Sequence, residues 1–314
     1  MKKIAFVSGS DSNYFPLLVE WIHCLRNHPD NTLKNYDICI MDTGMSDEQH
    51  AYIKTVADKV IKPDWPCDLP AHRVRGREYL KSCVCRPFIN KIFEGYDTYF
   101  WMDADTWIQN WNAIETFIKG AEKDTIVLSG QMDRAYPKGM RVKWIGSWPY
   151  KARSFYFSNA RRAFGIKMAK EIFPYHVILA GAFCMNKDAP HWNKWQELIL
   201  QALKKGKVFT AEQLTLGIMV HLHKYPAEIL PAYMHWLCGF KPLWDEKNKK
   251  WVEPYLPHEE LGILHLSGFD EMRVDRSQTT DYKTLDGGTV HMNYRYMAFD
   301  GEKALEKTTD EAAA

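Results

Sequence analysis

Short apolar runs alternate with polar turns over the first part of the chain. Residues 3–8, 36–41 and 56–61 are mostly apolar, and each run predicts a β-strand. Between the first two runs, the apolar side chains from Leu17 to Leu25 recur every three and four positions, which predicts a helix. Ser46, with Glu48 and Gln49 after it, predicts a capped helix start. The resulting strand–helix–strand–helix–strand order predicts an α/β fold with a doubly wound, mostly parallel sheet.

The same alternation continues more loosely to residue 268. We expect a helix over 78–94, kinked or restarted at Pro87, helices near 114–118 and 189–205, and another that Thr210 caps. Apolar runs predict strands at 125–129, 177–185 and 228–230. Residues 131–159 interrupt the alternation of strands and helices with aromatic, Pro and Gly residues. This long insertion is either a structural excursion or an acceptor-binding lid, and we favour the lid.

One apolar run ends abruptly in two carboxylates. Residues 99–102 read as a buried strand, and Asp103 and Asp105 follow it directly. In an extended chain two such residues point the same way, at the strand end where open α/β sheets bind ligands. With no basic residue beside them in the sequence they suit a divalent cation, although a plain strand-terminating pair is the alternative.

Composition limits the classes of function. The chain has 314 residues, is 46% hydrophobic and has a formal net charge of +2, which argues against a dedicated nucleic-acid binder. It has no apolar run of about 20 residues that would span a membrane. Basic surface patches leave peripheral membrane association open, but no amphipathic helix requires it. Seven scattered cysteines favour a reducing, cytoplasmic location.

Two loops offer a nucleotide site. The polar turn after the first strand contains Ser8, Gly9, Ser10 and Asp11, ahead of a helix start that could hold a phosphate or a base. Asp42 follows the second strand at the same edge of the sheet as Asp103, where it could accept hydrogen bonds from a ribose or base. The alternatives are an ordinary strand–helix turn for the first loop and a cap-and-turn role for Asp42, because the turn lacks a known nucleotide-binding signature.

These motifs together resemble the GT-A glycosyltransferases, and most closely the retaining family-eight enzymes, the glycogenin and lipopolysaccharide galactosyltransferase group. The similarity is strongest from the Arg86 helix through Tyr-Phe-Trp-Met-Asp-Ala-Asp-Thr at 99–106. It covers residues 1–268 loosely, as a GT-A catalytic domain, and leaves 269–314 as a C-terminal extension packed on that domain with a frayed tail. A late His-x-x-Gly at His265 completes the pattern.

The resemblance implies a set of roles. Asp103, Asp105 and His265 would bind Mn²⁺ or Mg²⁺, and the metal would hold the diphosphate of a nucleotide sugar, a UDP-sugar for preference. Arg86 would contact both the carboxylate pair and the donor phosphates, and Glu212 and Gln213 would lie beside the anomeric carbon. Donor contacts would come from Ser8, Gly9, Ser10, Asp11, Asp42, Arg86, Ala104 and Gly181. The function implied is transfer of a hexose to a glycan, lipid-linked or protein acceptor.

The sequence departs from the family pattern at two places. Leu179 stands where the family has an Asn that contacts the donor sugar, and Glu271 stands where a phosphate-binding Lys is expected. Arg273 or Arg276 could replace that Lys. Because an amide such as that of Gln213 is a poor nucleophile, retention by front-side attack is favoured, with Glu212 as the candidate if a covalent intermediate or general base is needed.

Three other functions compete. A haloacid-dehalogenase-type phosphatase also uses Asp-x-Asp, but it needs Thr at position 107, where this chain has Trp. A nucleotidyltransferase would need an Arg-bearing, Gly-rich loop after the first strand, and Ser8–Asp11 has no Arg. A non-catalytic carbohydrate- or nucleotide-binding protein on the same scaffold is the third alternative.

Overall fold

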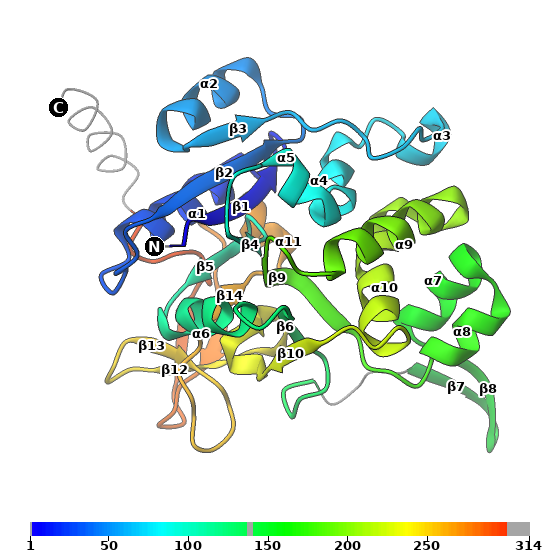
Figure 1. Cartoon of the computed structure of the whole chain (residues 1–314). Coiled ribbons are helices and arrows are strands. Elements are labelled where there is room, and N and C mark those ends of the chain that lie inside the picture. Colours follow the sequence, from blue (N-terminus) through cyan, green and yellow to red (C-terminus); the bar gives the residue numbers. More distant parts are fainter. Residues whose placement is uncertain (1, 137–140, 300–314) are drawn as a thin grey trace.

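A seven-stranded sheet forms the centre of the molecule in the computed structural model, which describes residues 2–136 and 141–299. The strand order is β10-β6-β9-β4-β1-β2-β3 (Figure 1). The strands are β1 (Ile4–Ser10), β2 (Tyr36–Asp42), β3 (Lys59–Ile61), β4 (Thr98–Met102), β6 (Ile126–Gly130), β9 (Ile178–Asn186) and β10 (Ala227–Leu230). Only β9 runs antiparallel to its neighbours in this sheet, so the predicted mostly parallel α/β fold is confirmed.

Helices cover both faces of this sheet. Alternate residues of β4 point to opposite faces, so that Phe100 and Met102 join one core and Tyr99 and Trp101 the other. The first core is covered by α1 (Phe15–Asn27), α2 (Asp47–Val56) and α6 (Asn112–Ala121). The second packs against α4 (Lys81–Val84), α5 (Ile89–Ile92), α7 (Phe155–Phe164), α8 (Ile166–Ile172), α9 (His191–Lys205) and α10 (Val208–His221).

A three-stranded sheet lies beside the carboxyl end of β4. It has the order β11-β14-β5, with β11 (His235–Leu237), β14 (Ile263–His265) and β5 (Thr106–Ile108). Strand β14 pairs antiparallel with β5, and the register sets His265 opposite Thr106. A segment from the last fifth of the chain therefore lies directly against the residues that follow Asp105.

The described part of the C-terminal extension packs on the first core. It contains α11 (Asp270–Val274), β15 (Thr280–Lys283) and β16 (Thr289–Met292), and Met272, Tyr282 and Tyr294 are buried in that core. Arg295 forms a buried ion pair with Glu20 of α1, and Arg276 also contacts that carboxylate. The tail from residue 300 lies outside the described residues.

The remaining short elements complete the chain. They are a β-hairpin of β12 (Leu243–Asp245) and β13 (Lys250–Val252), one short helix α3 (Ala71–Val74), and the 3₁₀ turns Glu78–Leu80, Arg86–Phe88, Ala232–Met234 and Cys238–Phe240. Within the described ranges, no helix combines the length and the hydropathy needed to cross a membrane.

Two local predictions differ from the structure. The expected helix over 78–94 is a series of one-turn pieces, because Pro87 lacks an amide proton and the chain restarts around it. Thr210 lies inside α10, which begins at Val208, and its hydroxyl donates to Asn159 Oδ1 instead of capping. The segment 131–159, predicted to break the strand–helix rhythm, contains a hairpin of β7 (Arg141–Ile145) and β8 (Trp148–Arg153), followed by α7, and its role as a lid stays a prediction. Positions 137–140 lie outside the described residues.

Candidate metal centre and donor site

Asp103 and Asp105 lie in a tight turn between β4 and β5. The Thr106 amide donates to the Asp103 carbonyl at 3.1 Å and the Thr106 hydroxyl donates to the same oxygen at 2.7 Å. The two aspartates are therefore not on one face of an extended strand, as the sequence pattern suggested. A turn closed by its own hydrogen bonds brings the two carboxylates together instead.

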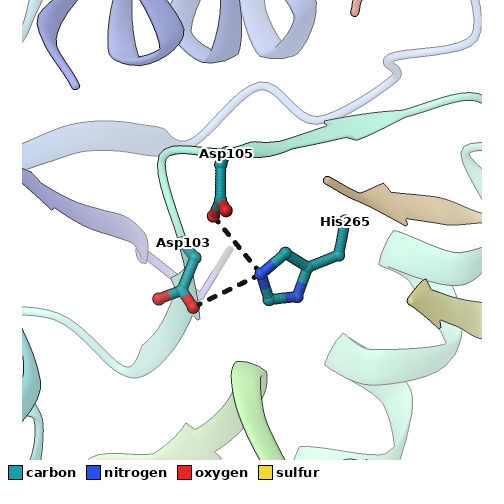
Figure 2. Close-up of side chains that lie close together, drawn as sticks. All are labelled: Asp103, Asp105 and His265. Atoms are coloured by element: carbon teal, nitrogen blue, oxygen red, sulfur yellow. Dashed lines mark ion pairs between the residues drawn. The ribbon is translucent and has the colours of Figure 1, made fainter. Parts of the chain in front are cut away.

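His265 completes a three-residue cluster with this pair. Its Nε2 is 3.3 Å from Asp105 Oδ1 and 3.8 Å from Asp103 Oδ2. Figure 2 marks both contacts with dashed lines. One ligand atom from each residue lies within 4.8 Å of the others. Two carboxylates and one imidazole suit Mn²⁺ or Mg²⁺, and the nitrogen shifts the preference towards Mn²⁺. The structure thus brings together the three residues that the resemblance implies.

Gly181 of β9 allows this close packing. The Gly181 carbonyl accepts a hydrogen bond from the Asp103 amide at 2.8 Å. A Cβ at position 181 would lie 2.6 Å from His265 Cε1 and 3.1 Å from Asp103 Oδ2. The glycine in the middle of this apolar strand is therefore explained by the side chains of the cluster, which need that space.

A second histidine lies behind His265. The Nε2 atom of His235 is 3.1 Å from His265 Nδ1, and its Nδ1 is 2.9 Å from the Ser129 hydroxyl. The two imidazoles stack, with centroids 5.2 Å apart. If His265 Nδ1 donates to His235, its Nε2 lone pair points at the aspartates, which is the tautomer that a metal ligand needs. Sequence reasoning missed His235, although it too lies on a short apolar run.

Arg86 connects the cluster to a second carboxylate. Its guanidinium is buried, donates to the Ala180 carbonyl at 3.0 Å and to Glu212 at 3.1 Å, and forms an ion pair with Asp103. Burial opposes the charge, but Asp103 and Glu212 outweigh it and raise the pKa of Arg86. Burial, together with the Asp103 charge, raises the pKa of Glu212 to about 7, although Arg86 beside it favours the charged form.

Arg273 contacts the cluster from the other side. It extends from α11, and its Nη2 lies 2.7 Å from Asp105 Oδ2. Burial opposes ionisation of Asp105, but His265 and Arg273 keep the pKa of that carboxyl below its usual value. The aspartates that have no basic neighbour in the sequence therefore have two arginines beside them in the fold. Of the two candidate replacements for the missing Lys, Arg273 reaches the site and Arg276 pairs with Glu20 instead.

A cavity of about 720 Å³ opens above the cluster. Most predicted donor-site residues line it: Gly9, Ser10, Asp11, Arg86, Asp103, Ala104, Asp105, Gly181, Glu212, Gln213 and His265. Gln213 donates from Nε2 to the Ile178 carbonyl at 3.0 Å, which holds its amide at the wall. Tyr14, Tyr79, Phe155 and Phe209 also line the cavity, and no motif singled them out.

Ser8 and Asp42 are not among the lining residues. The Ser8 side chain is fully buried. Asp42 accepts hydrogen bonds from the Gly44 and Met45 amides at 3.0 and 2.8 Å and contacts His50 Nδ1 at 2.6 Å. Its carboxylate thus stabilises the turn after β2, in agreement with the cap-and-turn alternative. In the structure a donor role for either residue would be indirect.

The fold matches that of a known glycosyltransferase. The bifunctional glycosyltransferase WbbM, in its apo structure, aligns with 85% of this chain and 46% of its own, with a TM-score of 0.52 and 13% sequence identity. The chain has the GT-A glycosyltransferase fold. It spans less than half the length of WbbM. No protein-family model and no curated protein sequence matches the chain.

Two structures of LgtC also align with this GT-A chain. The galactosyltransferase LgtC with donor and acceptor sugar analogs has a TM-score of 0.49 and 13% identity, and an LgtC active-site mutant has 0.48 and 12%. Each alignment covers 84% of this chain and 87% of LgtC. At 12 to 13% sequence identity, the alignment compares the course of the backbone and not the roles of side chains. The role of each side chain in this GT-A fold must come from its own geometry.

Proposed function

We propose that this protein is a metal-dependent glycosyltransferase that moves a hexose from a nucleotide diphosphate sugar to a glycan or glycoconjugate acceptor. A UDP-sugar is the donor that we expect. The observation that carries the proposal is the cluster of Asp103, Asp105 and His265 in the wall of a cavity of about 720 Å³. Such a cavity has the size of pockets that take small organic ligands. Seven free thiols support a reducing compartment, and we assign the protein to the cytoplasm.

The residues around the cluster suit a departing diphosphate. Asp103, Asp105 and His265 would hold Mn²⁺ or Mg²⁺, which supplies charge neutralisation to the leaving phosphates when bound. Arg86 contacts Asp103, Arg273 contacts Asp105, and both line the cavity, so both would bind phosphate oxygens with permanent charge. Arg273 in this role would replace the Lys that is missing at 271.

The surroundings of Glu212 and Gln213 favour retention by front-side attack. Glu212 is buried and holds Arg86, so its carboxylate is engaged as a positioning group. Gln213 lines the cavity and presents an amide, which is a poor nucleophile. Proton NMR of the first-formed product with an α-linked donor should show an α-linkage. A β-linkage would exclude retention.

Asp105→Asn tests the proposed function. Donor hydrolysis or transfer by the wild-type protein, across a panel of UDP- and other nucleotide sugars, should require Mn²⁺ or Mg²⁺. Since Asn removes one charged ligand, we expect the variant to lose about 100-fold or more of this activity and to bind Mn²⁺ more weakly in calorimetry. Asp281→Asn is the control, because that carboxylate is exposed. Activity that is unchanged in Asp105→Asn would exclude the metal role of this residue, and a wild type without activity on any donor would be a non-catalytic binder.

A further inference from the structure

The near-neutral net charge conceals a strongly segregated distribution. Residues 134–170 contain ten of the 41 Lys and Arg and none of the 39 Asp and Glu. This segment therefore has a formal charge of +10, and the remainder of the chain has −8. Arg161, Arg162, Lys167 and Lys170 of this segment are exposed on α7 and α8. Helices α7 and α8 thus present four exposed cations that belong to a segment without any carboxylate.

The β7–β8 hairpin combines this charge with exposed aromatic side chains. Its strands pair only with each other among the described strands, and Figure 1 shows the hairpin projecting beside α8. Four large apolar side chains around its turn are 60 to 78% exposed, namely Trp144, Ile145, Trp148 and Tyr150. Ile145 is paired with Trp148 next to the turn, so the apolar side chains gather at the tip. Lys143 is exposed beside them.

This hairpin belongs to a segment that leaves the cavity wall and returns to it. Gln131 precedes the hairpin and Phe155 follows it, and both line the cavity above the metal cluster. The two ends of the hairpin segment therefore lie in the cavity wall, so a partner bound by the hairpin is connected to the donor site through this segment.

We propose that the β7–β8 hairpin binds the surface of an anionic lipid bilayer. Trp and Tyr side chains favour the membrane–water interface, and clustered Lys and Arg are attracted to anionic headgroups. The −8 charge of the remaining chain would be repelled by the same surface, which orients the protein with the hairpin towards the lipid. If the proposed function holds, on which this last step rests, the acceptor is lipid-linked and meets the cavity at the bilayer.

A bilayer accounts for the hairpin better than the other partners do. In a symmetric dimer the same basic surface would face its own copy, and two +10 segments repel each other. A nucleic acid would use the cations and could stack on Trp, but it offers nothing to exposed Ile145. A bilayer would take up the apolar side chains of the tip and attract the exposed cations of the same segment, so it uses both properties.

Vesicle co-sedimentation of the full chain, without donor or acceptor, tests this inference. We expect binding to phosphatidylcholine vesicles that contain phosphatidylglycerol, weak binding to phosphatidylcholine alone, and a decrease as salt is raised. The double variant Trp144→Ser/Trp148→Ser should bind at least about tenfold more weakly, as should Lys143→Glu/Arg161→Glu/Arg162→Glu. Leu256→Ser is the control, because Leu256 is 77% exposed outside the basic segment, and it should bind like the wild type.

The outcomes separate this inference from the proposed function. The variants change exposed side chains, so their melting temperatures and their donor hydrolysis in solution should equal those of the wild type, and Asp105→Asn should still bind vesicles. The inference is overturned if the Trp double variant sediments with anionic vesicles as the wild type does. It is also overturned if the wild type binds a single-stranded RNA but no vesicle. The same holds if the Trp double variant loses a dimer detected by light scattering but keeps its vesicle binding.

Discussion

Gly181 shows how one missing methyl group determines the geometry of the metal cluster. A Cβ there would meet both His265 and Asp103. We expect Gly181→Ala to weaken Mn²⁺ binding by about tenfold or more in calorimetry, because His265 must rotate away from the aspartates. Gly120→Ala is the matched control: its Cβ would lie 2.7 Å from Val127 Cγ2 in the core, so it should reduce stability but leave metal affinity unchanged. An equal loss of Mn²⁺ affinity in both variants would show that the effect comes from reduced stability and not from displacement of His265.

His235 should control the tautomer of His265. His235→Phe keeps a ring of similar size but leaves His265 Nδ1 without its acceptor, and we expect Mn²⁺ affinity to fall by about 10- to 100-fold. His235→Gln, which can still accept, should recover part of the loss. His191→Phe serves as the control, since His191 is equally buried and contacts the Pro226 carbonyl instead. Unchanged affinity in His235→Phe would exclude a positioning role.

Glu212 should make stability depend on pH. Its pKa of about 7 in the folded protein exceeds the ordinary value of 4.5, so the folded state binds the proton more tightly than the unfolded chain. The proton on Glu212 therefore contributes up to about 3 kcal/mol to the free energy of unfolding. This stabilisation is complete below pH 4.5 and is lost as the pH rises through about 7. Urea unfolding from about pH 5 to 8 should show this loss relative to Glu212→Gln, which stays neutral. A constant difference between the two proteins would contradict it.

Among the elements, β14 and β9 complete the site that β4 begins. The register between β14 and β5 sets His265 opposite Thr106, where its imidazole contacts Asp105. Strand β9 contributes Gly181, whose carbonyl accepts from the Asp103 amide. Arg86 comes from a 3₁₀ turn whose Pro87 interrupts the helix expected there. Local patterns predicted the strands themselves, because alternation and apolar runs are properties of neighbours in sequence. They could not predict which strand end lies beside which, because pairing between distant strands is decided by packing.

The buried pair of Arg295 and Glu20 should anchor the C-terminal extension to α1. Both side chains are nearly inaccessible, so Arg295→Met leaves the Glu20 charge with Arg276 as its remaining ion-pair partner among the described residues. We expect a loss of about 3 kcal/mol in the free energy of unfolding by urea. Glu20→Met/Arg295→Met should recover most of it, since no unpaired charge remains. Lys2→Met, which breaks an exposed pair with Glu122, should cost less than about 0.5 kcal/mol.

Over the whole molecule, charge is distributed in a way that the totals do not show. The composition correctly gave a net charge near zero, but that value combines a segment of +10 with a remainder of −8. The segregation itself is visible in the sequence. The exposure of Trp144 and Trp148 is not, because an aromatic residue is by default a core residue. Only the hairpin, whose strands pair with no other described strand, shows that these side chains face outwards.

The sequence by itself determined the α/β class, most strand positions and the Asp103–Asp105 pair, since these depend on local periodicity and composition. The tertiary structure decided everything that depends on contacts between distant segments. It placed His265 and Arg273 beside the pair, put His235 behind His265, and engaged Asp42 in its own turn. A metal cluster needs ligand atoms within a few ångströms of each other, and the residues that supply them here are separated by more than 150 positions of chain.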